Sequence, residues 1–198
     1  MLEAITLAVE GRADEAVGKR LLADAGIQTT AVYGLNGKHY LDKRLAKYNN
    51  AARFSTWMVL RDLNSDESCA PVLRARLLPS PAPRMRLHIV VRAVEAWLLA
   101  DHKAFSEFLG VRSGDLPANP EEVLQPKFAL IELARTSRKG AIRDGFVPAP
   151  GSTAKVGPGY TAMITEFATR TWRPKIAASR SASLDRLLRH LDALQSSR

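Results

Sequence analysis

Residues 54–67 read FSTWMVLRDLNSDE and decide the fold of this chain. The apolar run at 54–60 has the composition of a buried strand, and it stops abruptly at the polar stretch RDLNSDE. Residues 68–78 then favour a helix, and LHIVV at 87–91 predicts a second buried strand. Strands that alternate with helices are typical of a parallel sheet with right-handed crossovers.

The N-terminal residues predict the same alternation. The apolar run AITLAV at 4–9 indicates a strand that ends at the dipeptide EG, and apolar residues at helical spacing follow at 13–25. The stretch QTTAVY at 28–33 predicts another strand, and a short basic helix is expected at 42–48. We therefore expect an α/β fold with a mostly parallel sheet flanked by helices.

Beyond residue 101 the pattern contains helices and no convincing strand. Helices are expected near 103–109, 120–135, 159–170 and 183–195. The segment 140–159 is rich in glycine and proline and predicts a loop. The expected organisation is an α/β core over residues 1–101 and a helical extension over residues 102–198 that packs on it.

The composition is that of an ordinary globular protein, with 46% hydrophobic and 25% charged residues among 198. The single cysteine, Cys69, excludes an internal disulfide, and no Cys/His cluster offers a zinc site. The first residues lack the pattern of a signal peptide, and no run approaches the roughly 18 apolar residues of a membrane span. We expect a cytoplasmic protein.

The chain is basic, with a formal net charge of +9. Residues 102–198 hold 15 basic against 9 acidic side chains, so the second half carries most of the surplus. Such a surplus favours a polyanionic partner such as nucleic acid. Because many basic proteins bind no nucleic acid, composition alone leaves both readings open.

Acidic side chains follow two of the predicted strands at the point where each strand ends. Glu10 closes the first strand and Asp14 follows it. A later strand is followed by Asp62, Asn64 and Asp66. Ligands of an open parallel sheet bind beyond the carboxyl ends of its strands, so adjacent strands would bring both groups to one edge. Oxygen ligands suit Mg²⁺ or Mn²⁺, and we expect these side chains to bind such an ion.

Glu95 and Asp101 form a second candidate pair, because Glu95 opens a helix at the same edge of the sheet. The pair could complete a second metal site, as in enzymes that hold two ions across a phosphoryl displacement. The alternatives are structural: the acids after the later strand could cap the next helix, and Glu95 and Asp101 could be helix-end residues.

Positive charge is also needed to hold a scissile phosphate. Arg12 and Arg61 lie beside the acids in sequence, and Lys127 is a candidate from the helical extension. Residues of this kind are more often solvated surface bases. The basic residues that could follow a nucleic-acid backbone are Arg135, Arg138, Lys139, Arg143, Lys155, Arg170, Arg173 and Lys175. Tyr160 and Trp172 could stack on bases, or Trp172 could belong to the core.

These residues also resemble a known family. The motifs EGRAD at 10–14 and DLNSD at 62–66 resemble the Toprim pattern of topoisomerases, bacterial primases and the overcoming-lysogenisation-defect nucleases. More closely, VEGRADEAVGKRLL, VLRDLNSDESCA, VRAVEAWLLAD and ASRSASLDRLLRHL resemble, in order and spacing, a bacterial family of Toprim-like proteins of about this length.

The resemblance implies divalent-metal chemistry on nucleic acid, with Glu10 as metal ligand or general acid/base and Asp62 as the principal ligand. Asn64 stands where the pattern has its next acidic residue. An amide oxygen can ligate Mg²⁺ but brings no charge, so the affinity for metal falls unless Asp66 compensates. This departure bears on catalysis more than on metal binding.

We therefore expect a Mg²⁺-dependent nuclease, or a related phosphodiester-processing protein, that acts on DNA or RNA. The resemblance implies a bacterial antiphage defence or repair effector with a partner ATPase, and the sequence has no P-loop of its own. The alternative is a non-catalytic nucleic-acid- or protein-binding module, which Asn64 favours. A phosphatase with an aspartyl nucleophile fits less well, because it expects DxD directly after the first strand.

Overall fold

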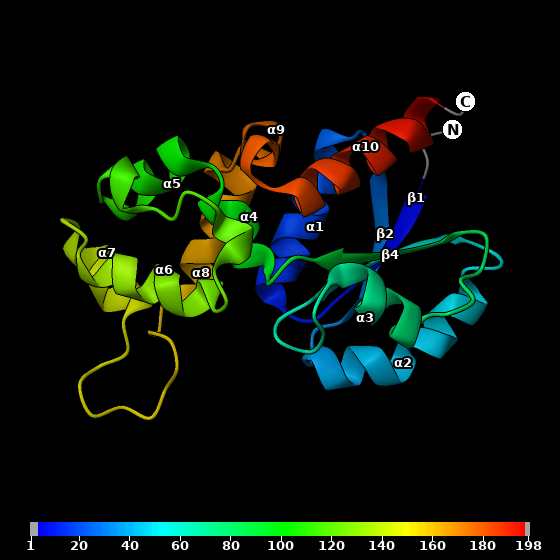
Figure 1. The fold of residues 1–198 in the computed structure, drawn as a ribbon, viewed down its shortest axis with the longest axis horizontal. Coiled ribbons are helices and arrows are strands. Elements are labelled where there is room, and N and C mark those ends of the chain that lie inside the picture. The colour runs from blue at the N-terminus through cyan, green and yellow to red at the C-terminus, as the bar shows by residue number, and fades with distance from the viewer. Residues whose placement is uncertain (1–3, 197–198) are drawn as a thin grey trace.

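The computed structural model describes residues 4–196 and is an α/β protein in which helices flank a four-stranded parallel sheet (Figure 1). The strands are β1 Ala4–Val9, β2 Gln28–Gly34, β3 Thr56–Asp62 and β4 Met85–Val90. The helices of the sheet-forming part are α1 Arg12–Asp24, α2 Lys38–Ala51, α3 Ala70–Leu77 and α4 Val94–Leu99.

The rest of the described chain is helical, and it contains no strand through residue 196. Its α-helices are α5 His102–Leu109, α6 Pro126–Arg135, α7 Gly140–Phe146, α8 Tyr160–Glu166, α9 Pro174–Ala177 and α10 Ala182–Ser196. It also contains three short 3-10 helices, η1 Ser113–Asp115, η2 Pro120–Glu122 and η4 Ala178–Arg180, and one π-helix, η3 Phe167–Thr171. The expected fold class, with helices after the sheet, is confirmed.

The strand order β2-β1-β3-β4 places a topological switch point between β1 and β3. The chain runs outward from β1 to β2 and then returns past β1 to form β3. Right-handed crossovers in opposite directions put α1 and α2 on opposite faces of the sheet. Ile5 and Leu7 accordingly share a buried cluster with α1, and Ala8 shares another with α2. Ligands of such sheets bind at the switch point, beyond the carboxyl ends of the strands.

One apolar cluster joins the sheet to the helices after residue 101. Helix α4 lies at its centre, and all six of its residues are buried. Trp97 of this helix is fully buried, in one cluster with Leu7 of β1 and with Phe146 and Trp172 of the helical part. Figure 1 shows α4 between the sheet and the helices α5 to α8. The hydrophobic core therefore does not divide at residue 101.

The expectation of a loop over residues 140–159 is wrong for its first part, because Gly140–Phe146 forms α7. Two glycines suggested a loop, but Gly145 lies within this helix and packs closely against a side chain of a later helix. A Cβ at Gly145 would lie 2.5 Å from the Sδ atom of Met163, which belongs to α8. The expected helix at 120–135 is also interrupted. Pro126 disfavours helical geometry in the residue before it, and α6 begins only there.

The loop between α7 and α8 is closed at its base by backbone contacts. The amide of Gly157 donates to the carbonyl of Phe146 at 2.8 Å, and the amide of Gly159 donates to that of Gly145 at 2.9 Å. A Cβ at Gly157 would lie 2.4 Å from the carbonyl oxygen of Gly145 and 2.6 Å from the carbonyl carbon of Phe146. Both are backbone atoms, so they cannot move aside as a side chain could.

Gly157→Ala is therefore expected to lower the free energy of unfolding by about 1–3 kcal/mol, the usual cost of overpacking. The measurement is urea unfolding. Gly114→Ala is the control, because a Cβ at Gly114 meets no atom within 4 Å. An equal change in both variants would contradict the close approach at Gly157.

Candidate functional site

Glu10 and Asp62 meet at the switch point of the sheet. Residues of β1 and β3 pair side by side, Glu10 follows the last residue of β1, and Asp62 is the last residue of β3. The backbone amide of Asp62 donates to Oε1 of Glu10 at 2.9 Å. The sequence-based expectation that these two strand ends lie together is confirmed by this contact.

Two further buried carboxylates, Asp14 and Glu95, join Asp62 on the α1 face. Asp14 lies in the first turn of α1 and Glu95 in the first turn of α4. The exposed fractions of Asp14, Asp62 and Glu95 are 7%, 9% and 2%. Burial of three carboxylates in one region is costly unless each finds a partner. Their contacts therefore decide what the site can bind.

Glu95 is held by the helical part of the protein. The hydroxyl of Tyr160 in α8 donates to Oε1 of Glu95 at 2.7 Å, and Nζ of Lys127 in α6 lies 3.3 Å from the same oxygen. Asp14 and Asp62 differ, since Oδ1 of each is buried and has no hydrogen-bond partner among the described residues. The site thus contains two buried carboxyl oxygens without hydrogen-bond partners and one carboxylate with partners.

The electrostatics of the cluster reflect this imbalance. Burial raises the pKa of Asp14 to about 7, and the charges of Glu95 and Glu10 contribute. Burial also raises the pKa of Asp62 well above its ordinary value, and Asp14 and Glu10 act in the same direction. The pKa of Glu10 is raised by burial although Arg61 opposes the change. The site favours the arrival of positive charge, whether as protons or as a cation.

Lys127 supplies part of that charge. Burial lowers the pKa of Lys127, but Glu95, Asp14 and Asp62 together reverse the effect, so its pKa is raised. Burial and Glu95 likewise raise the pKa of Tyr160, which keeps its hydroxyl protonated as a donor. Lys127 is a permanent cation beside three carboxylates, and its side chain is 55% exposed toward solvent.

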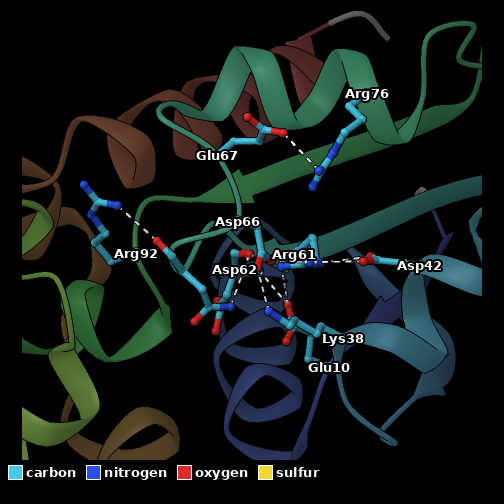
Figure 2. A network of polar contacts seen from close by, with 10 residues as sticks. Glu10, Lys38, Asp42, Arg61, Asp62, Asp66, Glu67, Arg76 and Arg92 are labelled. Carbon is cyan, nitrogen blue, oxygen red and sulfur yellow. Dashed lines mark hydrogen bonds and ion pairs between the residues drawn. The ribbon is translucent and has the colours of Figure 1, made fainter.

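Arg61 is buried among carboxylates on the other face of the sheet, as Figure 2 shows. Its side chain is 2% exposed. The guanidinium binds both carboxylate oxygens of Asp42 at 2.9 and 3.0 Å, Asp66 at 2.6 Å and Glu10 at 3.3 Å. Lys38 also contacts Asp66 at 2.6 Å. Two predicted site residues thus already have ionic partners within the protein. Arg61 is not available to a phosphate, and Asp66 is neutralised by two cations.

Asn64 and Asp101 occupy different surroundings. Asn64 has a φ of 49°, in the left-handed region that asparagine tolerates, and its Nδ2 lies 3.5 Å from the carbonyl oxygen of Asp62. Asp101 is fully buried, accepts from the amide of Ala104 at the start of α5, and pairs with Arg173 at 2.5 Å. The structure therefore leaves Asn64 at the site and separates Asp101 from it as a helix cap.

Three residues with left-handed backbone follow three strands of the sheet. Leu35 after β2, Asn64 after β3 and Arg92 after β4 have φ values of 64°, 49° and 57°. The amide of Asn64 donates to the carbonyl of Arg92 at 2.8 Å, and Nη1 of Arg92 donates back to the carbonyl of Asn64 at 3.0 Å. Such strained residues gather at functional edges, where the surrounding structure holds them.

A cleft of about 960 Å³ opens directly over Asp62 and Glu95. Its walls come from α6 and from the loop after α7, and they carry the basic side chains Lys127, Arg135 and Lys155. Phe128 and Leu124 also line the cleft and are 59% and 65% exposed. The arrangement is an acidic floor beneath basic and apolar walls.

Only some of the predicted nucleic-acid contacts lie at this cleft. Lys155 lines it. Arg12 pairs with Glu15 on the exposed side of α1, and Arg138 is exposed outside the cleft lining. The Nζ atom of Lys139 donates to two backbone carbonyls at the end of α5, which caps that helix. Of these four residues, only Lys155 lines the cleft.

The two aromatic candidates are not stacking surfaces. Tyr160 is 3% exposed and Trp172 is fully buried, so neither ring is open to a base. The contact between Tyr160 and Glu95 spans 65 residues in sequence and left no local signal. Phe128, which does face the cleft, stood within an apolar helical pattern that resembled an ordinary core face.

No group of three or more His, Cys, Asp or Glu side chains among residues 4–196 is already gathered at metal-binding spacing. No helix in the same range is long and apolar enough to cross a membrane. Comparison with protein-family models, curated proteins and solved structures yields no match.

Proposed function

We propose that this chain is a cytoplasmic, divalent-cation-dependent nuclease that hydrolyses phosphodiester bonds of DNA or RNA. The single observation that carries the proposal is Asp62, a buried carboxylate with an unpartnered oxygen at the floor of a basic cleft. An anionic oxygen in that position attracts a cation, and the walls attract a polyanion. Together they favour a phosphodiester bridged to a metal ion.

The donor set fits Mg²⁺ or Mn²⁺, which prefer oxygen ligands and retain several waters. Asp62 and Asp14 would hold the ion, since each has a buried oxygen without a partner among the described residues. Glu10 and Glu95 contribute negative potential to both. When bound, the ion supplies charge stabilisation at the phosphate and a more acidic water.

The protein's own groups then have separate tasks. Glu10, whose pKa burial raises, is placed at the strand exit to accept the proton of an attacking water. The P–O bond to one nucleoside breaks as the bond to the water oxygen forms, and solvent protonates the departing oxygen. Lys127 faces the same region and would bind a non-bridging phosphate oxygen. Arg61 holds Glu10 in position by an ion pair at 3.3 Å.

The test is incubation of the purified chain with supercoiled, linear and single-stranded DNA and with RNA, in Mg²⁺, Mn²⁺ or EDTA. Cleavage that requires metal and is lost in Glu10→Ala and Asp62→Ala supports the proposal. Cleavage that persists unchanged in both variants contradicts it. Asp115→Ala is the control, because Asp115 pairs with Arg112 on the surface, outside the cleft lining.

The exposed ring of Phe128 predicts a preference for unpaired strands. A base can stack on an exposed aromatic face, which contributes about 1–3 kcal/mol per base. Phe128→Ala is therefore expected to weaken single-strand binding about tenfold and duplex binding much less. Fluorescence anisotropy with labelled oligonucleotides measures both. Phe54→Ala is the control, since Phe54 is 82% exposed before the start of β3; equal losses in the two variants would refute stacking at the cleft.

A second candidate function is a non-catalytic nucleic-acid- or protein-binding module. Such a module would have the same fold but would not cleave a phosphodiester bond. Two observations favour it: Asn64 brings no charge, and the carboxylates of residues 4–196 are not gathered at metal-binding spacing. Tight nucleic-acid binding without cleavage in either metal supports the module. Both proposals include a separate ATPase chain and a role in defence or repair. Repeating the cleavage and binding assays with such an ATPase added tests that part of each proposal.

A further inference from the structure

A second pocket, of about 410 Å³, lies along the edge strand β4. Figure 1 shows α3 and α10 on either side of β4, and both helices contact it. The residues that line this pocket are all different from those of the cleft over Asp62. It is therefore a separate site, and nothing in the proposed nuclease chemistry uses it.

The polar lining of this pocket is basic. Arg74 comes from α3, Arg86 and His88 from β4, and Arg186 and His190 from α10. No aspartate or glutamate is among its described lining residues. Three arginine side chains line this concavity, and their positive charges repel one another unless an anion joins them. One of them, Arg86, also donates from Nη1 to the carbonyls of Pro83 and Met85.

Carboxylates of the neighbouring segments already have other partners. Asp185 of α10 pairs with Arg189 at 2.6 Å, and Glu67, in the turn before α3, pairs with Arg76 at 3.0 Å. Neither arginine lines the pocket. The hydroxyl of Ser183, which does line it, is directed to the carboxylate of Glu121. The positive charge of the pocket thus remains without a compensating acid in its lining.

The positive charges around this pocket also act on His88. Its ring lies 5.4 Å from that of His190, and burial lowers its pKa to about 3, with His190, Arg74 and Arg86 acting in the same direction. The imidazole is therefore neutral at physiological pH and can donate one N–H. An anion in the pocket would oppose every one of the charge effects on this ring.

We propose that this pocket binds a phosphomonoester carried by a ligand of mononucleotide size. Guanidinium groups match the oxygens of a phosphate better than any other side chain, and Arg74 and Arg186 line the pocket together with Arg86. The remaining walls are apolar, from Leu78, Leu87 and Ile89. The volume lies in the range of small-ligand sites, so an organic ring has room beside the phosphate.

The chemistry has two sources, a free nucleoside monophosphate and the phosphorylated 5′ end of a strand. The experiment is calorimetric titration in EDTA with AMP, adenosine, and a short oligonucleotide with either a 5′-phosphate or a 5′-hydroxyl. We expect AMP and the 5′-phosphorylated strand to bind and to compete, and adenosine and the 5′-hydroxyl strand to bind at least about tenfold more weakly. A strand that binds while AMP does not identifies the polymer end as the source.

The variant Arg74→Gln/Arg186→Gln is expected to lose about tenfold or more in affinity for AMP, because charge-assisted hydrogen bonds are removed. Arg76→Gln/Arg189→Gln changes the same helices by the same charge outside the pocket and should bind AMP as the wild type does. In NMR, AMP should move the titration midpoint of His88 upward. Equal losses in both double variants, or equal binding of adenosine and AMP, would overturn the proposal.

Discussion

Asp62→Asn is expected to reduce metal-dependent cleavage by about a thousandfold, which corresponds to about 4 kcal/mol of transition-state stabilisation. The substitution keeps the shape of the side chain and removes the charge. An amide oxygen can still approach the ion, but the attraction between opposite charges is lost. The affinity for Mn²⁺, measured by calorimetry, should fall together with the rate.

The same variant should be at least as stable as the wild type when no metal is present. Burial and the charges of Asp14 and Glu10 raise the pKa of Asp62, which means that its ionised form is unfavourable in the folded protein. Thermal unfolding in EDTA measures this. Loss of cleavage with retained or increased stability separates a ligand role from misfolding.

Asp24→Asn is the matched control, because Asp24 pairs with Arg20 on the outer surface of α1. It should cleave and bind Mn²⁺ as the wild type does. Wild-type cleavage in Asp62→Asn, or a loss of activity in proportion to a loss of folded protein, would remove Asp62 from the proposed centre.

Asp14 predicts an unusual dependence of stability on pH. Its pKa is about 7 in the folded protein, and the ordinary value of 3.8 is the reference for the unfolded chain. Between these values the folded protein holds a proton that the unfolded chain has released. The free energy of unfolding in EDTA should therefore fall as pH rises from about 4 to about 7, by up to roughly 4 kcal/mol.

Asp14→Asn should reduce this fall, and what remains comes from Asp62 and Glu10, whose pKa values burial also raises. The variant should match the wild type below about pH 3, where Asp14 is protonated in both states, and exceed its stability at pH 8 in EDTA. Mn²⁺ should stabilise the wild type at pH 8 more than the variant, since an ion bound only to the folded state adds to its stability. Urea unfolding at both pH values measures the difference.

Glu132→Gln is the control for this series, because Glu132 pairs with Arg135 on the surface of α6. It should show the pH dependence of the wild type. A variant Asp14→Asn with an unchanged slope would mean that the carboxyl group is not protonated near neutral pH, and that the cluster carries less negative potential than its burial indicates.

The sequence predicted the sheet well because its strands are short apolar runs that end abruptly. Glu10 and Asp62 were found at the strand exits for the same reason, since the parallel order follows from alternating strands and helices. Boundaries were less accurate where packing overrides local preference. Gly145, for example, suggested a loop, but it lies within a helix at a close contact with Met163.

The partners within the site could not be predicted. Arg61 was a candidate for binding a phosphate or for a solvated surface base, but it follows Leu60 on an alternating strand and therefore points to the face that carries Asp42. Which of two faces holds the ligand is not encoded in the local pattern. Tyr160 and Lys127 contact Glu95 only because helices that are distant in sequence pack around α4. No spacing in the sequence predicts a contact of that kind.

The apolar cluster around Trp97 also limits how the chain can be divided. If translation or proteolysis stopped the polypeptide after residue 101, the inner surfaces of α1 and α4 would face water instead of Phe105 and Phe167. The N-terminal fragment would contain all four carboxylates of the site, Glu10, Asp14, Asp62 and Glu95, but it would expose a large apolar surface to water. It is therefore expected to aggregate and not to act as a minimal enzyme. A stable folded protein therefore needs residues from both sides of position 101.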